Sequence, residues 1–233
     1  MRDYIYFNNK NLDEFDTYAT NAGVYSAPAR NYESIPVAGR NGNLIFESKS
    51  LENIEHSYPV IVMSDFDKNY AALKAYLLSQ KGYKRLSDTF YPDEFYLATF
   101  SRFDSVKQKF LHGTMGTCIL IFERKPQRYL KSGEKVITLL SNSTIKNPCQ
   151  FDALPRVRVH GSGTLNIGDT SVTINTQSEY LDIDCELQEV LQAGGNLDVT
   201  LTNGEFPKLT PGNNTISFTG ISKVEITPRW WTL

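Results

Sequence analysis

The sequence predicts a mainly β protein: an N-terminal α+β domain, made of β-sheets and one helix, precedes an all-β sandwich or jelly roll. Three observations support this fold class. The 233 residues include 13 Tyr and 13 Phe, residue types that favour strands over helices. Only one segment has the periodicity of an amphipathic helix. From Asn147 onward, short strand patterns follow one another at even spacing, separated by Gly-, Asn- and Asp-containing turns.

Strand patterns lie on both sides of the predicted helix in the N-terminal domain. Ser57–Met63 is dense in β-branched residues, and Cys118–Phe122 is apolar on both faces, which predicts a central position in its sheet. The first strand should stop at Asn8-Asn9. The expected strands are Tyr4–Phe7, Thr17–Ala19, Asn31–Val37, Leu44–Phe46, Ser57–Met63, Tyr83–Leu86, Phe95–Phe100, Phe110–Gly113 and Thr117–Arg124.

The predicted helix follows Met63. Phe66, Tyr70, Leu73 and Leu77 recur at spacings of four, three and four residues, so they form one apolar stripe. Ser64 or Asp65 can cap the first turn, because a short polar side chain accepts a hydrogen bond from a free backbone N–H there. We expect the apolar stripe to pack against a sheet.

Residues Pro36–Phe46 predict a tight β-hairpin. Asn41-Gly42 favours a type I′ turn, whose two central residues need the positive φ that Asn and Gly adopt most easily. One strand should then end near Ala38, and its partner should begin near Leu44. Such a hairpin can extend a sheet beyond the body of its domain, where a neighbouring chain can pair with it.

The C-terminal part has alternating apolar and polar residues, most clearly in Arg156–His160 and Thr170–Ile174. Asp184–Gln192 has room for one helical turn. The predicted domains are residues 1–130, a polar linker at 131–146 with one possible strand at Val136–Leu140, and residues 147–233. The expected C-terminal strands are Leu154–His160, Thr164–Ile167, Ser171–Ile174, Tyr180–Asp184, Asn196–Leu201, Asn214–Phe218 and Lys223–Pro228.

The formal net charge is -2 and the pI is about 6.0, so no global positive field draws in nucleic acid or anionic lipid. The basic residues in Arg124–Lys131 are expected to form a solvated strand end. The N-terminus has no apolar signal-peptide region, and no apolar run approaches the roughly 18 residues of a membrane span. We therefore expect a soluble protein made in a reducing cytoplasm.

No catalytic, cofactor or metal motif is recognisable, so we expect a non-enzymatic protein without cofactor or metal. The three Cys form no CxxC pair, and the three His lie on separate elements. Three weaker features stay open. Cys118 and His112 could form a dyad, although a buried inert cysteine is the commoner case. Asp182 and Asp184 share one strand face, as calcium ligands or as solvated carboxylates.

The third open feature is the pair Trp230-Trp231, which could stack on sugar rings. Adjacent strand residues point to opposite faces, so one of the two should be buried. This pair and the predicted jelly roll support an alternative function, a carbohydrate-binding, lectin-like module for host cell-wall glycans.

The ordered set of motifs resembles one known family. The N-terminal motifs are Val37–Leu44, Lys84–Asp88, Tyr91–Ala98 and Ile121–Tyr129; the C-terminal motifs are Leu154–Gly163, Tyr180–Asp184, Gly204–Asn214 and Thr227–Trp231. Their order and spacing are similar to those of the distal tail protein (Dit) family of long, non-contractile-tailed bacteriophages and prophages of Gram-positive bacteria. The resemblance covers nearly the whole chain.

The resemblance implies a structural protein of the virion, assembled in the bacterial host cytoplasm. Family members form a ring, usually a homohexamer, at the tail tip. Their N-terminal domains make the ring around the DNA channel, and DNA passes through without specific binding. Their C-terminal domains are galectin-like jelly rolls that project outward and can hold receptor-binding proteins. The ring joins the tail tube protein to the tail-associated hub protein, with no membrane involved.

Two further expectations follow from the resemblance. Some family members carry a carbohydrate-binding insertion in the C-terminal domain, but the roughly 85 residues after the linker fit a bare jelly roll. The hairpin is expected to make subunit contacts within the ring, with its interface residues at the tip. These residues are Ala38, Gly39, Arg40, Asn41, Gly42 and Asn43.

Overall fold

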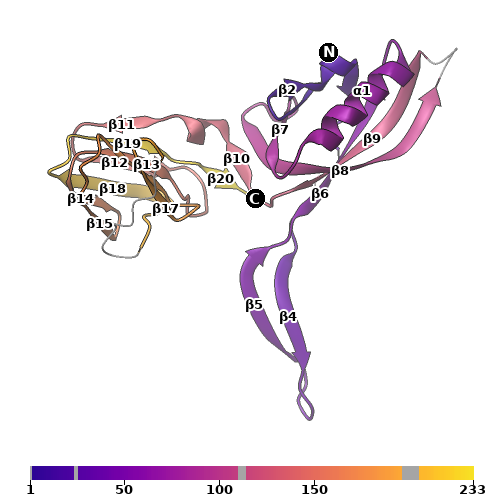
Figure 1. The fold of residues 1–233 in the computed structure, drawn as a ribbon. Helices are drawn as coiled ribbons and strands as arrows, with labels where there is room; N and C mark the ends of the chain where they lie inside the picture. Colours follow the sequence, from indigo (N-terminus) through magenta and orange to yellow (C-terminus); the bar gives the residue numbers. More distant parts are fainter. Residues whose placement is uncertain (1, 24–25, 110–113, 196–204) are drawn as a thin grey trace. The chain divides into compact units, whose positions relative to one another are not determined.

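The computed structural model describes residues 2–23, 26–109, 114–195 and 205–233 (Figure 1). The chain divides into two compact units, Met1–Arg128 with Leu233, and Tyr129–Thr232. The predicted strands at Phe110–Gly113 and Asn196–Leu201 lie wholly outside the described residues. Among the residues described, no helix has the length and apolar character that crossing a bilayer requires.

The first unit is built on an antiparallel sheet with strand order β2-β1-β7-β8-β9-β6-β3. Its central strand β9 contains Cys118–Phe122, as predicted from its apolar faces. A 3-10 helix at Leu12–Phe15 precedes β3. The strands are β1 (Ile5–Phe7), β2 (Lys10–Asn11), β3 (Thr17–Ala19), β4 (Arg30–Pro36), β5 (Asn43–Leu51), β6 (Ile54–Val62), β7 (Lys84–Asp88), β8 (Glu94–Lys109) and β9 (Met115–Arg124).

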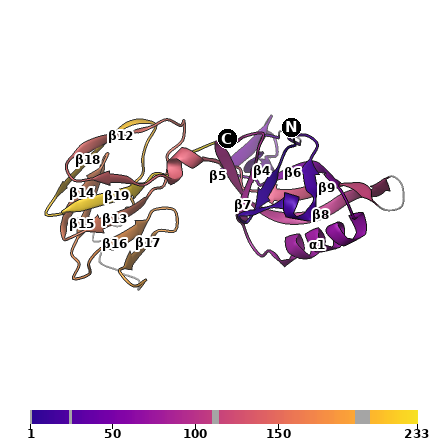
Figure 2. The same cartoon turned by 90° about the horizontal axis from the view of Figure 1, so that it is seen from above.

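The helix α1 (Phe66–Ser79) lies against one face of this sheet (Figure 2). Asp65 caps it by accepting a hydrogen bond from the Lys68 N–H at 3.2 Å, as the sequence predicted. The stripe residues Phe66, Leu73 and Leu77 are buried in the core of the unit. They pack with Phe7, Tyr58, Leu120 and Phe122 from the sheet, so helix and sheet share one hydrophobic core.

The second unit is a sandwich of two antiparallel sheets, in orders β11-β19-β13-β16-β17 and β12-β18-β14-β15. Alternate residues of the strands fill one core, which includes Val157, Val159, Leu165, Ile216 and Ile226. The sandwich strands are β11 (Ile137–Leu139), β12 (Ser143–Asn147), β13 (Arg156–His160), β14 (Gly163–Ile167), β15 (Thr170–Ile174), β16 (Leu181–Asp184), β17 (Glu189–Gln192), β18 (Gly212–Thr219) and β19 (Lys223–Thr227). Two short strands, β10 (Arg128–Leu130) and β20 (Trp231–Thr232), pair with each other outside these two sheets.

Two expectations about this unit are wrong. Residues 131–146 are not a linker, because β11 pairs with β19 and most of β12 pairs with β18 within this stretch. The possible strand expected at Val136–Leu140 is present as β11, whereas the polar, turn-rich composition hid β12, whose partners in β18 lie about 65 to 75 residues away. Asp184–Gln192 forms a turn and the strand β17 in place of a helical turn.

Candidate functional site

The hairpin β4–β5 is a two-stranded sheet that pairs with no other strand among the described residues. Every residue of β4 is exposed. Figure 1 shows the hairpin as a ribbon separate from the main sheet of its unit. The structure confirms the predicted hairpin but makes it longer, since pairing runs from Arg30↔Leu51 to Pro36↔Asn43.

The hairpin exposes apolar side chains on both of its faces. On one face, Ser34 and Ile45 lie opposite each other on the two strands. On the other face, Ile35 lies opposite Leu44, and Phe46 lies on the same face as this pair. The exposed fractions of Ile45 and Phe46 are 49% and 53%. A lone two-stranded hairpin is marginally stable in water, and clustered exposed apolar groups mark interaction surfaces. We call Arg30–Leu51 the interaction hairpin.

The tip of the interaction hairpin differs from the predicted turn. Val37–Gly42 connects the strands, and Arg40 N–H donates to the Val37 carbonyl oxygen at 3.3 Å. Positive φ values occur at Gly39 (+77°) and Gly42 (+83°), but not at Asn41. The first turn therefore fits type II, with Gly39 at its third position, and the predicted type I′ turn at Asn41-Gly42 is wrong. Two consecutive positive φ values occur instead at Asn8 and Asn9, between β1 and β2.

The structure places the six expected interface residues together at this exposed tip. Added Cβ atoms at Gly39 or Gly42 would meet nothing within 4 Å, so a substitution there would cost stability only through backbone strain.

We predict that Gly42→Ala weakens hydrogen-exchange protection of the interaction hairpin about fivefold, because the strain costs about 1 kcal/mol. Exchange of the peptide amides, followed by mass spectrometry, measures this. Asn41→Ala is the matched control and should change nothing; an equal effect of both would contradict the observed turn.

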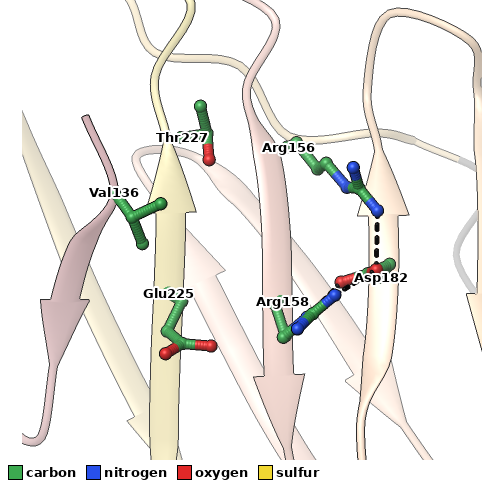
Figure 3. Close-up of a pocket in the computed structure, with 6 residues that line it drawn as sticks. All are labelled: Val136, Arg156, Arg158, Asp182, Glu225 and Thr227. Atoms are coloured by element: carbon green, nitrogen blue, oxygen red, sulfur yellow. Dashed lines mark hydrogen bonds and ion pairs between the residues drawn. The ribbon is translucent and has the colours of Figure 1, made fainter. Parts of the chain in front are cut away.

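The outer face of the five-stranded sheet carries a second candidate site. β13 pairs with β16 on one side and β19 on the other, so outward residues form rows across three strands. One row is Glu225–Arg158–Asp182, and the next is Thr227–Arg156–Asp184. With Val136, five of these residues line a pocket of about 310 Å³ (Figure 3). The lining residues are Val136, Arg156, Arg158, Asp182, Glu225 and Thr227.

Asp182 is held by two arginines at this pocket. Arg158 donates from Nε to Oδ1 at 2.7 Å and from Nη2 to Oδ2 at 2.9 Å. Arg156 donates from Nη2 to Oδ2 at 2.7 Å, and the Arg158 guanidinium lies 4.0 Å from the Tyr180 ring centroid. Burial alone would raise the pKa of Asp182, but these hydrogen bonds outweigh it and lower the pKa.

Asp184 has a similar arrangement beside the pocket. Arg229 donates to both of its carboxylate oxygens at 2.7 Å, and the Leu187 N–H donates to Oδ1 at 3.2 Å. Burial acts to raise the pKa of Asp184, and these partners lower it overall. Both aspartates are thus buried partners of arginines rather than solvated carboxylates. Within the described residues, no group of three or more His, Cys, Asp or Glu side chains could hold a metal ion.

The two aspartates make the stability of the sandwich depend on pH. Their folded-state pKa values lie below the ordinary 3.8, so their contribution is present above that value and is lost as the pH falls through the folded pKa values. Both Trp residues lie in this unit, so urea unfolding followed by Trp fluorescence reports on it. We expect the free energy of unfolding to fall as pH drops below 3.8.

The control for this pH prediction is the double variant Asp182→Asn/Asp184→Asn. It should lose about 1–3 kcal/mol per site at neutral pH and show a flatter acid limb. An unchanged acid limb would contradict the roles of these carboxylates.

The remaining titratable candidates are structural. Cys118 is 2% exposed, and burial raises the pKa of its thiol to about 12, so it is not a nucleophile near pH 7. Its proposed dyad partner His112 lies outside the described residues. His56 is buried, and burial, with a smaller effect from the charge of Arg124, lowers its pKa to about 4. His160 lies 3.1 Å from Glu225.

The basic cluster near Arg124 is not the solvated strand end that was expected. Arg124 is 1% exposed, and its guanidinium carbon lies 4.2 Å from the Tyr96 ring centroid. Arg128 donates from Nε and Nη2 to Glu94 Oε2, at 2.9 and 2.5 Å. Charge in the sequence indicated solvent exposure, whereas aromatic and carboxylate partners from distant segments draw these two side chains inward.

The tryptophan pair does not form an open stacking platform. Trp230 is buried in the sandwich core, as the alternation rule required of one of the two. Trp231 stacks on Phe151 with centroids 4.5 Å apart, and its Nε1–H donates to the Asp152 carbonyl oxygen at 2.9 Å. These contacts occupy one face and the polar edge of the Trp231 indole.

Known sequences and structures were compared with this chain. No protein-family model matches it, and no curated protein sequence matches it significantly. Among solved structures, it is similar to the Dit protein (gp 19.1) of phage SPP1, described as a paradigm of the hub adsorption apparatus in phages that infect Gram-positive bacteria. The TM-score is 0.76 at 15% identity, covering 99% of both chains.

Chains from the phage P2 baseplate in its activated conformation are also similar. With Ca the TM-score is 0.58, and with Sr it is 0.55, each at 10% identity and covering 97% of this chain. The matches cover 97% and 96% of those chains. The predicted mainly β fold with one helix and its resemblance to the distal tail proteins are confirmed at the level of the fold. The galectin-like character of the sandwich stays a prediction.

Proposed function

We propose that this chain is a structural subunit of a phage tail tip. The observation that carries the proposal is the likeness to SPP1 Dit over 99% of both chains, which includes both units in the same order. At 15% identity the two chains share few side chains, so what they have in common is the fold. In this role the protein is non-enzymatic and works through its surfaces.

Within this role, the subunits form a ring, and the expected assembly is a homohexamer. The interaction hairpin supplies the contact, because its apolar side chains are exposed on both faces and its strands need a covering partner. Tip residues Ala38–Asn43 contact the neighbouring subunit. A ring requires two different patches per subunit that close after a fixed rotation, and a protruding hairpin supplies one of them.

The ring would join the tail tube protein to the tail-associated hub protein, with the sandwich available to receptor-binding proteins. It would act in the virion, at the tail tip, after assembly in the host cytoplasm. The formal charge of -2 suits a ring through which DNA passes without being bound.

Size-exclusion chromatography with light scattering tests this proposal. The expected mass is about six times the 26.4 kDa of the chain, stable on dilution. A mass of one chain at every concentration, with and without the co-expressed hub protein, would overturn the ring.

A further inference from the structure

The pocket on the outer face of the five-stranded sheet is lined by polar groups whose hydrogen-bonding capacity is only partly satisfied within the fold (Figure 3). Arg156 is 46% exposed, and within the described chain only its Nη2 is hydrogen-bonded, to Asp182 at 2.7 Å. Its guanidinium has five N–H donors, so Nε and Nη1 remain for a ligand. The bond to Asp182 fixes the group in place, so little side-chain freedom is lost on binding.

Acceptors lie beside these donors. Glu225, on the neighbouring strand β19, is held by His160 and Lys223, each at 3.1 Å, and its carboxylate oxygens keep further lone pairs. Thr227, directly opposite Arg156, adds a hydroxyl that both donates and accepts. Neighbouring strands lie about 4.8 Å apart, so donor and acceptor groups alternate at short spacing across the pocket.

We propose that this pocket binds a saccharide through two neighbouring hydroxyl groups. Each sugar hydroxyl donates one hydrogen bond and accepts another, and Arg156 beside Thr227 and Glu225 offers that combination. Val136, 59% exposed at the pocket margin, provides an apolar surface for the C–H groups of a sugar ring. The volume of about 310 Å³ lies within the range of small-ligand sites.

The charges of the pocket favour a neutral ligand over an ion. Its lining has two arginines and two carboxylates, so neither a free anion nor a free cation meets a net opposite charge. Asp182 already neutralises much of the field of Arg156 and Arg158. This binding site shares no residue with the interaction hairpin. The saccharide proposal can therefore be wrong while the ring proposal holds, and the ring proposal can be wrong while the saccharide proposal holds.

Saturation-transfer NMR on the full-length protein tests the inference, because the signal is read on the small ligand and a large ring does not interfere. The probes are glucose, galactose, N-acetylglucosamine and rhamnose, with acetate and inorganic phosphate titrated by calorimetry as the ionic comparison. At least one saccharide should give a saturable signal. Arg156→Ala and Glu225→Gln should each weaken its binding about tenfold or more.

The controls separate binding from folding. Arg156→Ala leaves Asp182 with both bonds from Arg158, so the unfolding curve should stay close to wild type. Arg102→Ala removes another exposed arginine, from the first unit, and should leave saccharide binding unchanged. The inference is overturned if no saccharide of the panel binds saturably, if Arg156→Ala binds as well as wild type, or if only acetate or phosphate binds.

Discussion

Replacing Ile45 and Phe46 with aspartate is expected to abolish self-association of this protein and to leave the thermal unfolding of both units unchanged. Both side chains are about half exposed on the interaction hairpin, so neither core depends on them. They lie on opposite faces of the hairpin. Burying an unpaired carboxylate in an apolar contact costs several kcal/mol, so association should weaken roughly 100-fold or more.

Leu78→Asp and Leu187→Asp are matched controls for this double variant. Their side chains are 61% and 65% exposed, one belongs to each unit, and neither is part of the hairpin. Light scattering across a dilution series measures the outcome. Wild-type assembly by the Ile45→Asp/Phe46→Asp protein, or equal loss in the two controls, would show that the hairpin is not the contact.

The second large effect is expected at Gly163, where β14 meets β18. An added Cβ atom there would lie 1.9 Å from the backbone carbonyl oxygen of Thr219, and neither backbone can yield without separating paired strands. Gly163→Ala should therefore destabilise the sandwich by about 3 kcal/mol or more, at the upper end of overpacking effects. Urea unfolding followed by Trp fluorescence measures the change.

Gly168→Ala is the control for the close approach at Gly163. Gly168 also has a positive φ, of +57°, but a Cβ atom there meets nothing within 4 Å. Its cost should be about 1 kcal/mol, from backbone strain alone. If the two variants lose equal stability, the contact between Gly163 and Thr219 does not decide the packing of these strands.

The sequence predicted the features that local patterns determine. The stripe of Phe66, Leu73 and Leu77 gave the helix and its buried face, because helical periodicity is visible without knowing the partner. The apolar run at Cys118–Phe122 predicted a central strand, because a strand that is apolar on both faces is recognisable without knowing its partners. The existence of the hairpin also followed from local signals, although its length and turn type did not.

Features that depend on distant partners were missed. β12 lies in a polar stretch, and only its pairing with β18 makes it a strand. A strand was expected at the position of β11, but its place in the sandwich depends on its pairing with the distant β19. The alternation in β13 placed Arg156 and Arg158 on one face, but the register that brings Glu225 and Asp182 beside Arg158 comes from strands further along the chain. The polar pocket was therefore beyond sequence reasoning, which offered the tryptophan pair only as a weak candidate for a sugar site.

Negative-stain electron microscopy of the purified protein tests the central claim most directly, because it shows the particle formed by the subunits. A tail-tip ring subunit should give closed rings with a central opening, and the Ile45→Asp/Phe46→Asp variant should give none. If the wild-type protein gives no rings, neither alone nor mixed with its tail partners, the account is contradicted.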